Sequence, residues 1–216
     1  LLDFLNKEYP KIKNIKKGEN IIKSENFEKE IPDVISNLEN SFIVIQGPPG
    51  TGKTYQASHA IVELIKKGKK IGVSGKSHKV IQNLLKAVEK DAKKQNFEFK
   101  GLKKKGRDEE DVFNGKFIST PEGSDDRPFF HALRDKTHSL FAGTVYHLSK
   151  NFYDQALDVL FIDEASQVST ADVIAMGRCA KNLILVGDSQ QLAMPIRAKH
   201  PNESGKSCLD YLIDQD

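Results

Sequence analysis

The sequence predicts an α/β protein in which helices cover both faces of a parallel sheet, and three observations support this prediction. A short apolar run at residues 41–46 ends in Gly47 and is followed by a helical pattern over residues 53–67. The same order repeats, with a strand at 70–75 and a helix that begins at Ser77. A helix beginning near residue 169 or 170 then separates the last two of three further strand-like runs, at residues 139–144, 158–162 and 182–186. Such alternation is typical of parallel strands joined by helical crossovers.

Two segments depart from this rhythm. Residues 1–40 are lysine-rich and weakly patterned, and we interpret them as an N-terminal extension in which Pro32 begins a helix. Residues at about 91–135 are charged and contain Asn114-Gly115, a dipeptide typical of β-hairpin turns. The sequence therefore predicts one domain over residues 41–216 that carries a small inserted subdomain.

The composition limits the class of protein. With 216 residues, of which 38% are hydrophobic, the chain can form a core, and wholesale disorder is excluded. It lacks the roughly 18 consecutive apolar residues of a membrane helix and a secretory signal, so we expect a cytoplasmic protein without a membrane partner. Two cysteines, Cys179 and Cys208, are too few for a disulfide framework or a four-cysteine zinc site, and we expect ordinary thiols. Because the only methionines are Met176 and Met194, we expect a piece of a longer protein.

Charge is unevenly distributed along the chain. The formal net charge of +3 is too small to predict a polyanionic partner. Residues 86–107, however, include nine basic and three acidic side chains, and an acidic block follows at residues 108–111. This basic run is either a solvated helix end and loop or a surface that contacts a nucleic-acid strand, and the sequence favours neither interpretation.

The strongest functional signal is a glycine-rich loop between the first predicted strand and helix. Its residues fit the pattern G-x-x-x-x-G-K-[ST] and are Gly47, Pro48, Pro49, Gly50, Thr51, Gly52, Lys53 and Thr54. Glycines let backbone N–H groups surround phosphate oxygens, and the positive end of the following helix strengthens the attraction. We expect Lys53 to contact the β- and γ-phosphates of ATP, and the Thr54 hydroxyl to coordinate Mg²⁺.

A second signal is a pair of acids that follows a buried strand. The apolar residues 159–162 lead directly into Asp163 and Glu164. Parallel strands bring such acids to the carboxyl edge of the sheet, where the glycine-rich loop also lies. We expect Asp163 to hold Mg²⁺ and Glu164 to orient or deprotonate the attacking water. The loop and the acids should therefore converge on one hollow shaped for a triphosphate.

Three segments, in this order, resemble motifs I, II and III of superfamily 1 helicases. They are the loop at 47–54, Asp163-Glu164-Ala165-Ser166-Gln167, and Gly187-Asp188-Ser189-Gln190-Gln191-Leu192. Residues 77–84 are similar to motif Ia, and Gly143-Thr144 is similar to the threonine motif that precedes motif II. The likeness is strongest to the 5′→3′ branch of the superfamily. It implies a P-loop NTPase fold of the RecA-like type, here the first motor domain, with ATP and Mg²⁺ as cofactors.

The resemblance also assigns roles within the nucleotide site. Gln191 would sense the γ-phosphate, as a third catalytic residue beside Lys53 and Glu164, and Gln167 would help to arrange the bound nucleotide. An amide suits both roles, because it can donate to a phosphate oxygen or accept from water without changing the charge of the site.

Other residues would contact single-stranded nucleic acid, with DNA favoured over RNA. By resemblance, Ser77, Lys79 and Thr144 would hold the strand backbone. The alternatives of a helix cap, an exposed lysine and a strand-end threonine remain open for these three. Four phenylalanines of the insertion can stack bases or form a small core, and the packing role is favoured: Phe97, Phe99, Phe113 and Phe117.

A superfamily 1 motor closes its ATP site between two RecA-like domains, and the second domain supplies arginines that stabilise the transferring phosphate. After Leu192 too few residues follow for another such domain of about 150 residues. We therefore expect a second RecA-like domain outside this fragment as a partner, and a monomeric state. The fragment alone should hydrolyse ATP slowly and should not unwind duplexes.

Two other functions remain open. An AAA-type ATPase domain can carry the same glycine-rich loop, and assembly into a hexamer on adding ATP would favour it. A non-catalytic, nucleotide-gated nucleic-acid-binding module is the third candidate. It is weakened because the side chains needed for catalysis are all present, namely Lys53, Thr54, Asp163 and Glu164.

Overall fold

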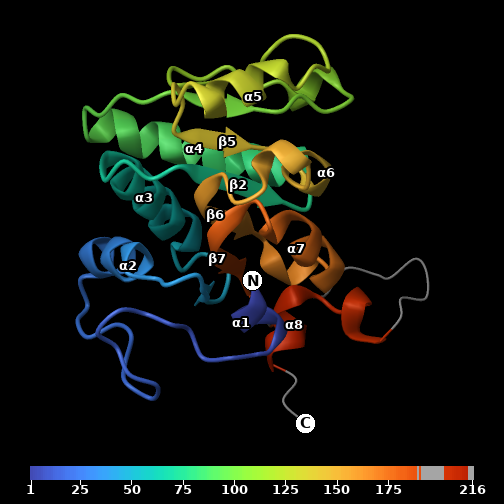
Figure 1. The fold of residues 1–216 in the computed structure, drawn as a ribbon. Coiled ribbons are helices and arrows are strands. Elements are labelled where there is room, and N and C mark those ends of the chain that lie inside the picture. Colours follow the sequence, from blue (N-terminus) through green and yellow to red (C-terminus); the bar gives the residue numbers. More distant parts are fainter. Residues whose placement is uncertain (189, 191–201, 214–216) are drawn as a thin grey trace.

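The computed structural model describes residues 1–188, 190 and 202–213, and it confirms the predicted α/β architecture. In this part of the chain, seven strands form one sheet in the order β1-β7-β6-β2-β5-β3-β4 (Figure 1). Every pairing between neighbouring strands is parallel. The strands are β1 (Phe42–Gln46), β2 (Ile71–Gly75), β3 (Gly101–Lys103), β4 (Ile118–Ser119), β5 (Leu140–Ala142), β6 (Leu157–Asp163) and β7 (Ala180–Gly187).

Two of the helices between the strands, α4 and α7, begin at a serine that caps them. Ser77 accepts a hydrogen bond from the Val80 N–H at the start of α4, and Ser169 accepts one from the Asp172 N–H at the start of α7. The α-helices of the described residues are α1 (Leu2–Leu5), α2 (Phe27–Ser36), α3 (Lys53–Lys66), α4 (His78–Lys94), α5 (Arg127–Arg134), α6 (Val145–Leu148), α7 (Thr170–Gly177) and α8 (Cys208–Ile213). None of them is both long enough and apolar enough to cross a membrane.

Successive strand residues alternate between two hydrophobic cores, one on each face of the sheet. In β6, Val159 and Phe161 join the core that α3 and α4 cover, whereas Leu160 and Ile162 join the core that includes residues of α5, α7 and α8. Figure 1 shows α3 and α4 on one side of the central strands and α7 and α8 on the other. Both cysteines are buried free thiols in the second core, as expected for packed side chains.

The first forty residues pack against both cores. Phe4 of α1 lies edge-on to Phe42 of β1, with ring centroids 5.8 Å apart, while Ile35 and Leu38 belong to the core on the α3 side. The predicted division between an extension at 1–40 and a domain at 41–216 is not tested by these contacts and stays a prediction.

The predicted start of the helix at Pro32 is wrong. The helix begins at Phe27, where the Asn26 side chain caps it by accepting from the Lys29 N–H at 3.4 Å, and Pro32 lies inside it. Proline lacks one N–H donor but does not prevent the preceding turn from forming when a cap stabilises that turn.

The predicted hairpin at Asn114-Gly115 is also wrong, because β3 and β4 on either side of this dipeptide are parallel neighbours. Instead, the turn after Gly115 lies on the buried Glu89 carboxylate of α4, which accepts from the N–H groups of Lys116, Phe117 and Ile118 at 3.0, 2.7 and 2.9 Å. A Cβ at position 115 would clash with Glu89 Oε1. The glycine is therefore required by this close approach and not by a hairpin.

The inserted segment is thereby joined to the main sheet and to the core on the α3 side. The strands β3 and β4 extend the sheet beyond β5. Phe99, Phe113 and Phe117 are buried in that core, and Phe97 packs against it half-buried. This confirms the packing role that the sequence favoured for these rings.

Replacing Glu89 with glutamine is expected to lower the free energy of unfolding by about 2–4 kcal/mol. The amide keeps one acceptor oxygen but turns an NH₂ group toward backbone donors that the carboxylate satisfies. Urea denaturation would measure the loss. Glu98→Gln is the matched control, since Glu98 is exposed and, within the part of the chain that the structure describes, pairs with the Lys116 side chain alone, at 2.8 Å. Equal stability of the two variants would contradict this account.

Candidate nucleotide and nucleic-acid sites

The glycine-rich loop runs from the end of β1 to the start of α3. Gly50 and Gly52 have φ values of +82° and +84°, in the left-handed region that favours glycine. A Cβ at Gly47 would lie 2.8 Å from the Thr51 hydroxyl oxygen, which donates to the Pro48 carbonyl at 2.8 Å. The curvature of the loop therefore depends on the glycines that the motif specifies.

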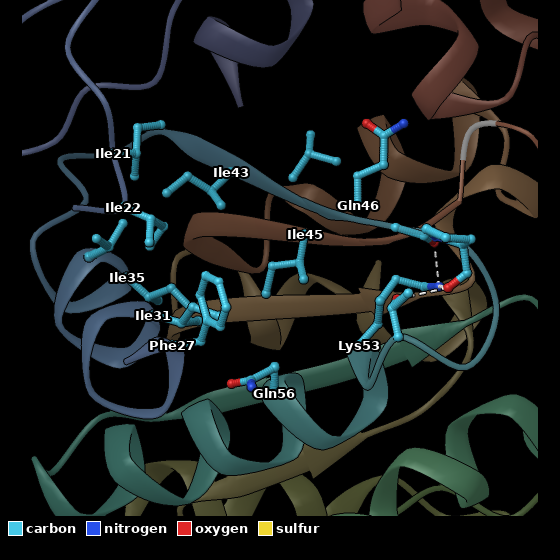
Figure 2. A pocket seen from close by; sticks show the side chains of 15 residues that line it. Ile21, Ile22, Phe27, Ile31, Ile35, Ile43, Ile45, Gln46, Lys53 and Gln56 are labelled. Carbon is cyan, nitrogen blue, oxygen red and sulfur yellow. Dashed lines mark hydrogen bonds between the residues drawn. The ribbon is translucent and has the colours of Figure 1, made fainter. Parts of the chain in front are cut away.

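Lys53 folds back over this loop (Figure 2). Its Nζ donates to the carbonyl oxygens of Gly47 at 2.5 Å and Pro48 at 2.8 Å. Both partners are neutral, and phosphate oxygens would offer the ammonium stronger, charge-assisted bonds. Thr54 follows on the first turn of α3 and is exposed.

The strand register brings the acids to the same edge of the sheet as the loop. Gln46, the last residue of β1, is in register with Gly187 at the end of β7, and β7 is followed in the sheet by β6, which ends at Asp163. Burial raises the pKa of Asp163 to about 6, against the lowering effects of the Glu164 N–H and the Lys53 ammonium. The lysine and the acid are therefore close enough to interact electrostatically.

Glu164 has an unusual backbone conformation. Its φ and ψ are 49° and 48°, in the left-handed region that is rare for residues other than glycine. Its N–H donates to Asp163 Oδ1 at 3.0 Å, and its Oε2 accepts from Gln167 Nε2 at 3.0 Å.

A cavity of about 500 Å³ opens beside the loop (Figure 2). Its walls are mainly apolar and include Phe27 and Ile31 of α2 and Ile45 of β1, while Lys53 lies on the side away from α2. Gln56 of α3 points into it, and its Oε1 is buried without a hydrogen-bond partner among the described residues.

The acid pair does not line this cavity. The strand β7 stands between β1, which leads into the loop, and β6, which leads into the acids. Loop and acids thus lie side by side along one edge of the sheet, and a single hollow shared by both stays a prediction.

A groove of about 740 Å³ lies farther along the same edge, past the ends of β2 and β5. It is lined by three basic residues and three acidic residues, together with Thr144 and Tyr146: Lys76, Lys105, Arg107, Asp108, Asp111 and Asp172. Tyr146 is 84% exposed, although aromatic residues usually bury most of their surface. The groove therefore offers cations, a hydroxyl and an accessible ring, which are groups that bind single strands without regard to sequence, next to carboxylates that repel phosphates.

The three residues expected at a nucleic-acid strand occupy different positions. Thr144 lines the groove, Ser77 caps α4, and Lys79 is exposed but is not one of the groove-lining residues of the described chain. Their contacts with a strand remain untested. Lys76 and Tyr146 were missed, although both closely follow the ends of strands, and that position at the carboxyl edge was the available signal.

One member of the basic run is not a surface residue. Lys103 of β3 is fully buried, and its Nζ donates to the backbone carbonyls of Lys104, at 3.2 Å, and Asp111. Burial lowers the pKa of Lys103 to about 8. Lys103 therefore holds the loop that carries Lys105 and Arg107 in place, and it is not available to an external strand.

The third motif lies partly outside the described residues. Asp188 is buried, and its Oδ1 accepts from the Gln190 N–H at 2.9 Å. Gln191, the expected γ-phosphate sensor, falls outside the described residues, so its role stays a prediction.

Comparison with known proteins identifies the family. A family described as an AAA domain matches residues 32–196. This range includes the loop, the acid pair, and the strands β1 and β6 that lead into them. The chain belongs to this family. The description alone does not separate a helicase motor from other ATPases of the AAA type, so the relatives decide between them.

Two relatives of this chain are named as helicases. The DNA replication ATP-dependent helicase/nuclease DNA2 of Saccharomyces cerevisiae is 25% identical over 172 residues, and the DNA replication ATP-dependent helicase/nuclease JHS1 of Arabidopsis thaliana is 27% identical over 171 residues. Each alignment covers 76% of this chain but only 10% and 12% of the respective relative. With the motifs above, these matches show that the chain is a superfamily 1 helicase motor domain, as the resemblance implied.

Two solved structures also resemble this motor domain. One is a nuclease-deletion mutant of the type ISP restriction-modification enzyme LlaGI in complex with a DNA substrate mimic, with a TM-score of 0.46 and 13% identity over 79% of this chain and 18% of that chain. The other is the C-terminal part of the Fun30 ATPase domain, with a TM-score of 0.43 and 13% identity over 66% of this chain and 42% of that chain.

Proposed function

We infer that this motor domain binds Mg-ATP at the glycine-rich loop and single-stranded nucleic acid in the groove, as the first of two RecA-like domains of an ATP-dependent helicase. The observation that carries this proposal is that the glycine-rich loop after β1 and the acid pair after β6 leave the same end of one parallel sheet. A phosphate-binding lysine and a metal-binding carboxylate placed together are the elements that ATP hydrolysis requires.

The residues of the loop fit a magnesium nucleotide. The Lys53 ammonium would exchange the carbonyls of Gly47 and Pro48 for phosphate oxygens. Oxygen donors are the ligands that Mg²⁺ prefers, and the Thr54 hydroxyl and the Asp163 carboxylate would hold it. The bound ion would neutralise charge on the phosphates, while Glu164 would accept a proton from the attacking water.

The apolar cavity between α2 and the loop would receive the base of the nucleotide. The Phe27 ring and the aliphatic side chains of Ile31 and Ile45 offer apolar contact to a base. Gln56 Oε1, which has no partner among the described residues, can accept a hydrogen bond from the amino group of adenine.

The groove would hold the strand, and we favour DNA over RNA because both helicase relatives are named for DNA replication. Thr144, Lys105 and Arg107 would contact phosphates, and the exposed Tyr146 ring would stack on a base. We further propose a monomer that acts in the cytoplasm with a second RecA-like domain.

Binding of this chain to an oligo-dT strand is expected to weaken steeply as salt rises, because each neutralised phosphate contributes a slope of about −0.7 in log affinity against log salt. Lys105→Ala should weaken binding and reduce the steepness by about 0.7. Fluorescence anisotropy at several salt concentrations would measure both. Lys181→Ala is the matched control, since Lys181 lies near the start of β7, at the amino ends of the strands, whereas the groove lies at their carboxyl ends. Salt-independent binding would reject a surface that reads the strand backbone.

A further inference from the structure

The expected catalytic acid is joined to the groove by an unbroken chain of hydrogen bonds. Gln167 Nε2 donates to Glu164 Oε2 at 3.0 Å, and Gln167 Oε1 accepts from Lys76 Nζ at 2.9 Å. The amide therefore uses its donor on the acid and its acceptor on the lysine. Its orientation is determined by both partners, because a flipped amide would face each partner with the wrong group.

The fold itself brings these three side chains together. Gly75, the last residue of β2, is in register with Asp163, the last residue of β6. Lys76 and Glu164 are the next residues of these two neighbouring strands, so they leave the same edge side by side. A single 3₁₀ turn, Ala165–Gln167, then returns Gln167 to Glu164, with the Gln167 N–H donating to the Glu164 carbonyl at 2.9 Å.

Lys76 and Gln167 both line the groove, and Lys76 is exposed. A strand in the groove would bring phosphates within reach of this ammonium. A phosphate carries a negative charge that the Gln167 amide lacks, so its attraction for the ammonium is stronger and the phosphate competes with Gln167 for Lys76.

We propose that Lys76, Gln167 and Glu164 form a switch through which a bound strand releases the catalytic acid. This inference rests on the proposed function. Without a strand, Lys76 holds the Gln167 amide with its NH₂ group on Glu164, which occupies one carboxylate oxygen and reduces its ability to accept a proton. When a phosphate of the bound nucleic-acid strand pairs with the Lys76 ammonium, the hydrogen bond from Lys76 to Gln167 is lost. The Gln167 amide can then turn away from Glu164, and the Glu164 carboxylate becomes available to accept a proton from the water.

The step that the switch controls is ordinary hydrolysis. The oxygen of water forms a bond to the γ-phosphorus, the bond from that phosphorus to the β–γ bridging oxygen breaks, and ADP leaves with that oxygen. The proton of the water passes to Glu164. The switch therefore makes ATP consumption depend on the strand by acting on the proton acceptor and not on nucleotide affinity.

The first test measures the affinity of this chain for an oligo-dT strand without nucleotide. Gln167→Ala frees Lys76, so the switch predicts binding that is tighter by about two- to fivefold. In the Gln167→Ala background, Lys76→Ala should then cost more affinity than it does in the unmodified chain. If Gln167 serves only to contact the strand or to support the loop, its removal weakens binding or leaves it unchanged, and either result overturns the proposal.

The second test measures ATP turnover with and without saturating oligo-dT, using radiolabelled ATP to follow slow rates. The ratio of the two rates should fall toward one in Lys76→Ala and in Gln167→Ala. A purely structural role would change both rates by the same factor, so an unchanged ratio overturns the proposal. Lys181→Ala serves as the control that should keep the ratio of the unmodified chain.

Failure of the switch gives a different result from failure of ATP or strand binding. If the unmodified chain binds neither ATP nor the strand, the proposed function fails and the switch fails with it. If both ligands bind normally and the variants show neither tighter strand binding nor a reduced ratio, only the switch is overturned.

Discussion

Replacing Lys53 with alanine is expected to raise the Kd for Mg-ATP by at least about 100-fold. The ammonium is the cation of the glycine-rich loop, and it also bonds to the carbonyls of Gly47 and Pro48. Its removal takes away the charge that faces the phosphates and loosens the loop that surrounds them. Isothermal titration calorimetry, or displacement of a fluorescent ATP analogue, would measure the change.

Two variants make this result specific to the site. Lys66→Ala, at the far end of α3, removes a lysine that pairs with Glu63 at 2.8 Å and should leave the affinity unchanged. Glu164→Gln should also bind Mg-ATP nearly as well as the unmodified chain, because this residue is assigned to the water and not to the nucleotide. Normal affinity in Lys53→Ala would reject the assignment of the loop to phosphate binding.

The chain by itself is expected to hydrolyse ATP about 10³- to 10⁵-fold more slowly than a complete motor with two RecA-like domains. An arginine from a second domain stabilises the charge that spreads over the transferring phosphate. Among the described residues, Arg127, Arg134 and Arg178 each pair with a nearby acid, and Arg107 lies in the groove. None of these four lines the cavity beside the loop.

Phosphate release at saturating Mg-ATP would measure this deficit, first for the chain alone and then for a protein in which it is joined to a second RecA-like domain. Addition of that domain should restore turnover, whereas substitution of its arginines should remove the gain. Turnover of this chain alone at the rate of a complete helicase would contradict the expectation, and it would mean that the chain supplies its own stabilising cation.

Much of the fold could be predicted because the signals are local. Each strand-to-helix alternation is encoded within about 25 residues by apolar spacing, and side chains such as Ser77 and Ser169 cap the helices in their own neighbourhood. The glycine-rich loop is local in the same sense, since Gly50 and Gly52 adopt backbone angles that the motif itself requires. The parallel arrangement then places Lys53 and Asp163 at one edge without further information.

The errors came where a local signal competed with a distant contact. Asn114-Gly115 is a hairpin signal when read alone, but Gly115 is needed because Glu89, 26 positions earlier in the chain, approaches it closely. Lys103 belongs to a basic run, yet a neighbouring loop covers it and its ammonium bonds to the carbonyls of that loop. Pro32 is a typical first residue of a helix, yet the cap at Asn26 begins the helix earlier.

The sequence by itself determined the α/β class, the glycine-rich loop and the acid pair, because each of these depends on residues adjacent in the chain. Only the tertiary structure decided that Lys76, Gln167 and Glu164 lie in one hydrogen-bonded line, and that Tyr146 faces a groove together with Lys105 and Arg107. The physical reason is that strand order and register fix which ends of strands are neighbours. The order of the strands in the sheet cannot be read directly from the spacing of residues along the chain.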